Sequence, residues 1–415
     1  MTPAPSLPER SAAAAAWRDL VFALLVGLGA YALSCALVWP LDTLPIFSAN
    51  WQKMSVDPFA LLGDFPHRLL TPLLAWLCGC RGEPGFLWFV RGMTVLMLAT
   101  ACLFARRRGA TPLDAVLVAV AVAVISPVQI YKLHWVGYVD ATTYTLLLWM
   151  LLVAHRPGVF WSLFLAALLN HELAAFLLPW AWFVRRQHDD RRRIDVLGAA
   201  AALGLYTAFY FYVRAAAPSQ LYNIDFFTRY PLFPGGTFAT LVVALVHWVV
   251  AFGPVLAVLG WFHHAPATRA ERGHLWWCLL GILVIFCIAW DWARHTNLLV
   301  VPLVVASTRF LVAGHRWLFV ALVASGVGLM LRWSPWPTVS WPTSEFASVP
   351  LLVGTGVVVG NETVGIGFGP LSAATTRWLP AVWPALWPIL LIAAAIWTTG
   401  FLIARVRKTP SSPGS

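Results

Sequence analysis

The chain has 415 residues, of which 60% are hydrophobic and 11% are charged, and its formal net charge is +11. Soluble domains contain about 25% charged residues, so this composition excludes an ordinary soluble fold. The positive charge does not indicate nucleic-acid binding, because it is concentrated in short loops at the ends of apolar runs, as in membrane proteins with basic cytoplasmic loops. The basic clusters contain Arg106, Arg107, Arg108, Arg185, Arg186, Arg191, Arg192, Arg193, Arg405, Arg407 and Lys408.

Apolar runs of about 17 to 26 residues recur along the chain, and such runs can cross a hydrocarbon core of ~30 Å as helices. Helices are expected because lipid-exposed backbone must satisfy its own hydrogen bonds, and the runs lack the alternation of a β-barrel. The sequence therefore predicts an all-α fold, a polytopic transmembrane helical bundle with about 10–13 spans. The predicted segments are 17–39, 85–105, 112–131, 139–155, 158–184, 195–216, 237–262, 274–291, 296–313, 316–332 and 382–404.

The N-terminal part begins with residues 1–16, which are rich in Pro and Ala and are expected to be a disordered cytoplasmic N-terminus. The transmembrane domain then covers 17–404, and its first span lacks a clear cleavage site, so we expect it to be retained. Segment 39–84 is the predicted first outside loop. Its apolar run 69–77 is too short to cross a membrane and is expected to form an interfacial helix.

Segment 158–184 is unusual because basic residues flank both of its ends, Arg156 before it and Arg185 after it. Both ends therefore favour the cytoplasm. The polar triplet Asn170-His171-Glu172 lies near its middle. Two half-helices that meet at this triplet would reconcile charge and length. A single long span with a buried triplet is the alternative, and it would invert the topology of everything that follows.

The C-terminal part contains a long predicted outside loop, 333–381, which is rich in Pro, Trp and Gly, and a cytoplasmic tail, 405–415. Basic loops on the cytoplasmic side place both termini in the cytoplasm. The Arg- and Ala-rich, Lys-poor composition is typical of a bacterial inner-membrane protein from a GC-rich genome. We therefore expect a multi-pass protein of the inner (plasma) membrane.

With this topology, the polar residues of interest fall on the side opposite the basic clusters. Ionisable groups at membrane depth cost about 2.5–3.5 kcal/mol each on insertion scales, so they are functional candidates by default. The candidates are Asp57, Asp64, His67, Arg68, Lys132, His134, Asp140, Asn170, His171, Glu172, Asp291, Arg294 and His295.

Each candidate also has a purely structural interpretation. Asp140 begins a predicted span and could cap its helix. Asp291 and Arg294 could form an ion pair at a span end, and His171 with Glu172 could be a buried pair that orders helix packing. The occurrence of several such groups on one side of the membrane favours a shared site.

Carboxylates, histidines and basic groups beside a bilayer suit sugar transfer from a lipid-phosphate donor. A carboxylate can act as general base on an acceptor hydroxyl. Arg, Lys or His can stabilise the departing phosphate through charge-assisted hydrogen bonds. The bilayer itself would hold the lipid part of the substrate.

Two features resemble the integral-membrane glycosyltransferases of the GT-C superfamily, of the bacterial polyprenyl-phosphate-sugar-dependent type. One is an Asp-containing first outside loop that ends in Arg68 and an interfacial helix. The other is Asn170-His171-Glu172-Leu173 followed by Phe176-Leu177-Leu178-Pro179. The resemblance implies that Asp64 or Asp57, with Asp42 a weaker candidate, is the catalytic base.

The resemblance also implies roles for the other candidates. Arg68, Lys132, Arg294 and His295 would contact the phosphate, while His171 and Glu172 would order the acceptor or support the base. His67, His134, Asp140, Asn170 and Asp291 would contribute to substrate binding. The implied partners are membrane lipid, a polyprenyl-phosphate sugar donor and a glycan or lipid acceptor, and nucleic acid is not among them. No cofactor is expected, and no ligand motif supports a divalent metal.

Other functions remain open at this point. A transporter or flippase could use the same charges to line a substrate or proton path, although such a path needs polar groups toward both sides. Metal-assisted lipid hydrolysis or transfer could draw on four histidines, but their spacing matches no ligand motif. A structural membrane subunit is the fourth reading. The sugar, the acceptor, the lipid carrier and the oligomeric state are left open.

Overall fold

The structure is a computed structural model that describes most of the expected helices. The described residues are 7–37, 49–61, 65–125, 128, 137–188, 192–218, 252–288, 297–333, 352–353, 356–359, 362–365 and 373–406. Predicted span 237–262 therefore lies mostly outside the described residues, as do the candidates Asp64, Lys132, His134, Asp291, Arg294 and His295.

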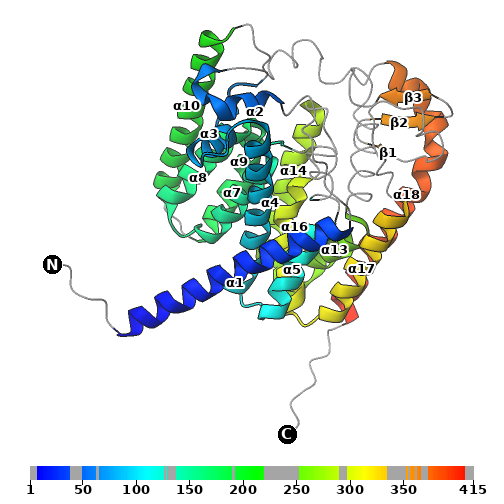
Figure 1. Ribbon diagram of the computed structural model, residues 1–415. Coiled ribbons are helices and arrows are strands. Elements are labelled where there is room, and N and C mark those ends of the chain that lie inside the picture. Colours follow the sequence, from blue (N-terminus) through cyan, green and yellow to red (C-terminus); the bar gives the residue numbers. More distant parts are fainter. Residues whose placement is uncertain are drawn as a thin grey trace.

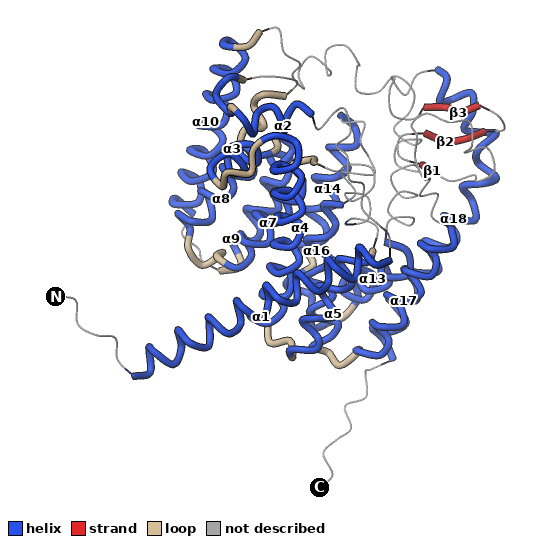
Figure 2. The backbone as a smooth tube through the Cα atoms, viewed as in Figure 1, coloured by secondary structure: helices blue, strands red, loops and turns tan. Residues whose placement is uncertain are grey.

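The first half of the chain forms a helical bundle (Figure 1 and Figure 2). Its elements are α1 (Leu7–Leu37), α2 (Ala49–Val56), η2 (Pro58–Ala60), α3 (Leu70–Leu77), α4 (Gly82–Arg107), α5 (Pro112–Val124), α7 (Asp140–Leu152), α8 (Pro157–Asn170), η3 (Glu172–Leu177), α9 (Leu178–Arg186) and α10 (Arg192–Ala216), where η marks a 3-10 helix.

The second half adds further helices and one small sheet. Its elements are η4 (Gly253–Val255), α13 (Leu256–His264), η5 (Pro266–Glu271), α14 (Gly273–Ile288), η6 (Asn297–Leu299), α16 (Val300–Val312), α17 (Arg316–Trp333), β1 (Leu352–Val353), β2 (Gly356–Val359), β3 (Glu362–Gly365) and α18 (Ala373–Val406). The strands pair antiparallel in the order β1-β2-β3, with Leu352 opposite Val357 and Val359 opposite Glu362.

Three of the described helices are long and apolar enough, by length and composition, to cross a membrane. They are residues Ala14–Leu37 of α1, α4 and α10. Most of the other helices are shorter apolar segments. The expectation of a largely helical chain with membrane-compatible helices is confirmed, and the total of about 10–13 spans stays a prediction.

Three parts of the chain differ from the sequence-based expectations. Helix α1 begins at Leu7, so much of the predicted disordered N-terminus is helical, in keeping with its run of Ala, the strongest helix former. Helix α18 begins at Ala373, well before residue 382. A small three-stranded sheet lies within the predicted loop 333–381, where Val-rich runs alternate with Gly and Asn, and the other described elements are helical, as predicted.

Close backbone approach joins two pairs of helices. Helix α1 packs on α4 at Gly27, where an added Cβ would lie 2.7 Å from the Val95 carbonyl oxygen and 2.8 Å from the Ala99 nitrogen. Helix α18 lies along α13 (Figure 1), and there Gly260 and Gly400 leave no room for a side chain. Small residues at such contacts are typical of packing between membrane helices.

Segment 157–186 forms a helical hairpin, α8–η3–α9, as the two-half-helix interpretation predicted. Buried Arg185, at the end of α9, donates to the carbonyl of Ala154, which precedes α8. Asp195, in the first turn of α10, accepts from Arg185 Nε at 2.7 Å and from Trp161 Nε1 at 2.9 Å. Both ends of the hairpin therefore lie at one end of the bundle, and its tip, Asn170 to Glu172, lies at the other.

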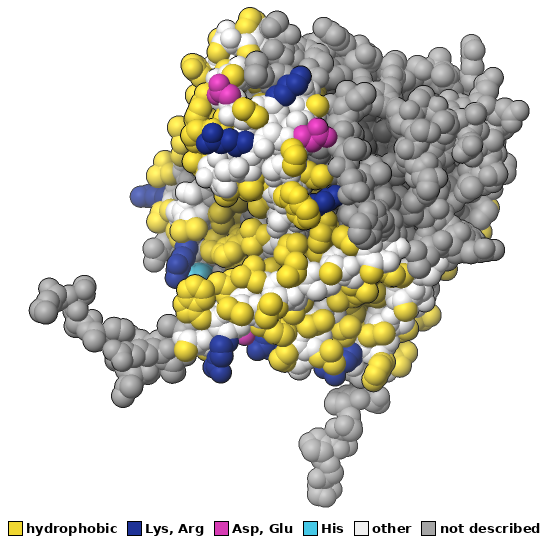
Figure 3. Space-filling model, viewed as in Figure 1, with side chains coloured by type: hydrophobic (Ala, Val, Ile, Leu, Met, Phe, Trp, Pro, Cys, Tyr) yellow, Lys and Arg dark blue, Asp and Glu magenta, His cyan; other side chains and the backbone are white. Residues whose placement is uncertain are grey.

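Several basic residues of the described part of the chain lie at the end of the bundle that holds the hairpin's base. Gln187, just after α9, donates to Ala270 of η5, and Glu271 of η5 accepts from Arg309 of α16 at 2.5 and 2.7 Å. At the start of α5, Asp114 accepts from Arg316 at 2.6 Å. Figure 3 shows several Lys and Arg side chains along the lower edge of a broad hydrophobic face. The distribution agrees with the charge pattern of the sequence.

Candidate functional site

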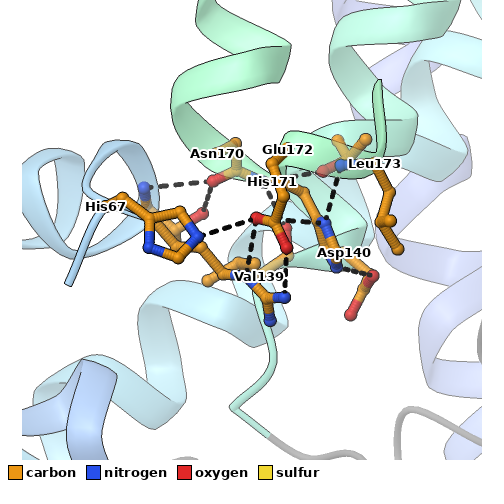
Figure 4. Close-up of polar contacts among 10 residues, drawn as sticks. His67, Val139, Asp140, Asn170, His171, Glu172 and Leu173 are labelled. Atoms are coloured by element: carbon orange, nitrogen blue, oxygen red, sulfur yellow. Dashed lines mark hydrogen bonds and ion pairs between the residues drawn. The ribbon is translucent and has the colours of Figure 1, made fainter. Parts of the chain in front are cut away.

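Five polar side chains meet at the tip of the helical hairpin, at the opposite end of α7 from the basic loops. Helix α7 has 13 residues, which corresponds to a separation of about 20 Å. The residues are His67, Arg68, Asp140, His171 and Glu172, and we call them the Glu172 cluster (Figure 4). Three segments far apart in the sequence supply them: the turn before α3, the first turn of α7, and the break after α8.

The break itself is made by the local chemistry of the triplet. Helix α8 ends because His171 adopts an extended conformation, with φ −155° and ψ 114°. The His171 Nδ1 atom accepts the Leu173 N–H at 3.3 Å and so caps the following 3-10 turn. The backbone groups that the break leaves without helical partners are thereby partly satisfied, as at other helix ends.

Asn170 is buried and joins three elements. Its Nδ2 donates to the Val139 carbonyl at 2.6 Å and to Thr143 Oγ1 at 2.8 Å, while its Oδ1 accepts from the Thr71 N–H at 3.2 Å and from the Thr71 hydroxyl. The amide thus uses its donors and acceptors within the protein. This geometry favours a structural role in placing the tip against α3 and α7 over the expected contact with substrate.

Glu172 lies at the centre of the cluster and contacts both cluster residues of the loop before α3, Arg68 and His67. Arg68 donates through Nη2 to Oε1 at 2.6 Å and through Nε to Oε2 at 3.0 Å, which is the two-point geometry of strong Arg–carboxylate pairs. His67 Nε2 lies 3.2 Å from Oε2. Arg68 was expected to contact phosphate, yet its guanidinium is instead occupied by a carboxylate from the same chain.

His171 lies between the two carboxylates of the cluster. Its Nδ1 is 3.6 Å from Glu172 Oε2, and its Nε2 is 3.8 Å from Asp140 Oδ1. Because Nδ1 accepts the Leu173 N–H, the neutral ring carries its proton on Nε2, which faces Asp140. His67, in the loop before α3, is fully buried, and that burial lowers the pKa of its imidazole despite the opposing charge of Glu172. This lowered pKa favours the neutral form of His67.

Aromatic side chains surround the charged pair. The Arg68 guanidinium carbon lies 4.4 Å from the ring centre of Phe65 and 5.8 Å from that of Trp51. Trp51 packs edge-to-face on Tyr138 at 4.8 Å, and His67 packs on Tyr210 at 5.0 Å. Such contacts hold an arginine in place and exclude water from its hydrogen bonds.

Four residues near the cluster were not among the candidates predicted from the sequence: Trp51, Thr71, Tyr206 and Tyr210. One signal was present for two of them, since Tyr206 and Tyr210 are four residues apart and therefore share a helix face. Trp51 and Thr71 carry no such signal, because aromatic and hydroxyl side chains are common in interfacial loops.

The remaining candidates do not join the cluster within the described part of the chain. Asp57 is exposed, and its Oδ1 accepts the Phe59 N–H at 3.2 Å, so it caps η2. Asp64 precedes Phe65 directly but lies outside the described residues. Across the described residues, no group of three or more His, Cys, Asp or Glu side chains is placed to hold a metal ion.

Comparison with known proteins adds no assignment to this geometry. No protein-family model, no curated protein and no solved structure matches the chain.

Proposed function

We propose that the protein is a membrane glycosyltransferase of the GT-C type that moves a sugar from a polyprenyl-phosphate donor to a lipid or polysaccharide acceptor. The observation that carries the proposal is the meeting of Glu172 with His67 and Arg68, because it joins the Asp-containing loop to the hairpin tip. Both resembling segments thus contribute to one polar cluster at the end of the bundle opposite the basic loops.

The proposed reaction is a displacement at the anomeric carbon of the donor sugar. The acceptor hydroxyl oxygen forms the new bond to that carbon, and the bond from carbon to the phosphate oxygen breaks. A carboxylate takes the hydroxyl proton, and polyprenyl phosphate leaves as an anion that needs nearby positive charge.

The proposed roles follow from what each described side chain already contacts. Asp64 is the proposed base, because Asp57 is exposed and caps η2. The Arg68–Glu172 pair would hold the loop that carries Asp64, and so would act by positioning. Lys132, Arg294 and His295 are the proposed phosphate contacts, since the Arg68 guanidinium is engaged by Glu172.

The proposed setting is the inner membrane of a bacterium, with about 10–13 spans, both termini in the cytoplasm and the reaction on the outer side. Support comes from the separation of basic loops and Glu172 cluster by the length of α7. Basic residues favour the cytoplasmic side, and the cluster then faces outward.

A flippase for a lipid-linked sugar is the second candidate. The hairpin is broken at Asn170–Glu172, and broken helices are also common in transporters. In that function the cluster would recognise the sugar without any bond being made or broken. The two candidates differ in the product: transfer consumes the donor and modifies an acceptor, whereas flipping changes only the side of the membrane on which the donor is found.

The test is the lipid-linked and envelope glycan profile of a deletion strain, complemented with wild type, Asp64→Asn or Asp57→Asn. We expect wild type and Asp57→Asn to restore the missing sugar, since Asn also caps a helix. Asp64→Asn, present at an equal level in the membrane, should not. Accumulation of donor without loss of any glycan would favour the flippase, and an unchanged glycan and donor profile in the deletion strain would refute both.

A further inference from the structure

The described side chains of the Glu172 cluster offer little to attract an anion. Arg68, the arginine of the cluster, donates two hydrogen bonds to Glu172, and the second carboxylate, Asp140, is 3% exposed. His171 is neutral in this geometry, because its Nδ1 accepts a backbone N–H, and burial favours the neutral form of His67. The guanidinium that would attract a phosphate is therefore already engaged by a carboxylate of the same chain.

Two buried polar atoms near this cluster have no hydrogen-bond partner within the described part of the chain. They are Nε1 of Trp51, whose residue is 2% exposed, and the hydroxyl of Tyr206, whose residue is 8% exposed. A buried polar group without a partner is costly, and native proteins rarely retain one unless water or a ligand satisfies it.

Chains of contacts connect both side chains to Glu172, for Trp51 through Arg68 and for Tyr206 through Tyr210 and His67. The Trp51 ring lies against the Arg68 guanidinium at 5.8 Å. Tyr206 packs at 6.3 Å on Tyr210, which packs on His67, and its hydroxyl is within electrostatic range of Glu172 and Arg68. Both partnerless atoms therefore belong to side chains near the Arg68–Glu172 pair.

The chemistry of the two atoms restricts what could satisfy them. The indole N–H only donates, and the phenol both donates and accepts. A hydroxyl group fits both, because it accepts from the indole and can donate to or accept from the phenol.

We propose that Trp51 and Tyr206 bind a neutral, hydroxyl-bearing group beside the Arg68–Glu172 pair, and that this group is a sugar. The inference rests on the proposed function for the identity of the group as part of a glycosyl substrate. The sugar would then lie beside the Glu172 cluster, and basic residues outside the cluster would contact the phosphate.

The test uses purified full-length protein in phosphatidylcholine nanodiscs and saturation-transfer NMR, which detects weak binding. The probes are methyl glycosides of common hexoses and pentoses, with methyl phosphate as the anionic comparison. Trp51→Phe and Tyr206→Phe remove one polar atom each and keep the ring. Trp88→Phe and Tyr212→Phe are matched controls, because those residues are 66% and 67% exposed.

We expect at least one glycoside to bind the wild type, and each test variant to raise its Kd about tenfold, while the controls leave it unchanged. Melting temperatures show whether each variant is folded, and Tyr206→Phe alone suffices if Trp51→Phe is not. The proposal is overturned if no glycoside binds the wild type, if both folded test variants bind like wild type, or if methyl phosphate competes at this position.

Failure of this proposal is distinguishable from failure of the proposed function. Glycoside binding that depends on Trp51 and Tyr206, together with an unchanged glycan profile in the deletion strain, would keep the sugar site and remove the transferase. A glycan defect without such binding would keep the transferase and place the sugar elsewhere.

Discussion

Arg68 and Glu172 are 104 residues apart in the sequence and meet through two hydrogen bonds of 2.6 and 3.0 Å. Arg68 comes from the loop before α3, and Glu172 begins the 3-10 turn at the hairpin tip. The guanidinium side chain is 5% exposed and the carboxylate side chain 13%. The pair therefore fastens the first loop to the hairpin and sets how the surrounding polar groups face one another.

Breaking this pair on one side is expected to destabilise the protein strongly. Glu172→Gln leaves the Arg68 charge buried without its counter-ion, and we expect a loss of about 3 kcal/mol in the free energy of unfolding. The double variant Arg68→Met with Glu172→Leu should recover most of that loss, because no charge is left unpaired. SDS-titration unfolding in mixed micelles measures both.

The same double variant separates stability from function. If the pair positions a catalytic loop, the variant should be stable yet fail to restore the glycan profile of the deletion strain. A double variant as unstable as Glu172→Gln would contradict the electrostatic account.

The buried pair Arg185–Asp195 should contribute more to the free energy of unfolding than the partly exposed pair Arg106–Asp19. Arg185 and Asp195 are 0% and 1% exposed and 2.7 Å apart, whereas Arg106 and Asp19 are 26% and 32% exposed and 3.5 Å apart. We expect Asp195→Asn to cost about 3 kcal/mol and Asp19→Asn less than about 1 kcal/mol. Equal effects in SDS-titration unfolding would argue against Arg185 as the anchor of the hairpin.

The contact between α13 and α18 should not tolerate even one added methyl group. A Cβ at Gly400 would overlap the Ala257 carbonyl oxygen and lie 2.6 Å from the Trp261 nitrogen, both backbone atoms that cannot move alone. Gly400→Ala should lower stability by about 1–3 kcal/mol. At Gly29 in α1 no atom lies within 4 Å, so Gly29→Ala should be neutral or stabilising by about 0.5–1 kcal/mol. Melting temperatures in one detergent compare the two.

Acidification should weaken the pair Glu271–Arg309 at the basic end of the bundle. Burial alone would raise the pKa of Glu271, but the hydrogen bonds and charge of Arg309 lower it below the ordinary value of 4.5. A carboxyl group with a lowered pKa in the folded state stabilises above its unfolded pKa and loses that contribution as the pH falls through its folded pKa.

The measurement is the melting temperature of wild type and Glu271→Gln from pH 7 to pH 3. The wild type should be the more stable of the two at pH 7, and the difference should shrink below pH 4.5. A difference that stays constant over this range would show that the carboxylate charge contributes nothing there.

Local patterns in the sequence predicted several features of this protein correctly. The length of the apolar runs predicted helices, because only a helix satisfies the backbone without water. Basic residues on both sides of 158–184, with Asn170 to Glu172 between, predicted the break and the hairpin. The polar residues His67, Arg68, Asp140, His171 and Glu172 were expected to share one side, and the structure brings them into one cluster.

The tertiary structure decided which of these groups contact one another. No local pattern shows that Glu172 takes the guanidinium of Arg68, that Asn170 uses its amide to join α3 and α7, or that Trp51 and Tyr206 lie beside the pair. These interactions link residues 17 to 138 positions apart, and they exist only once α2, α3, α7, α8 and α10 have packed. Sequence periodicity reports burial and local hydrogen bonding, whereas the partner of a buried charge depends on the distance between helices in the folded bundle.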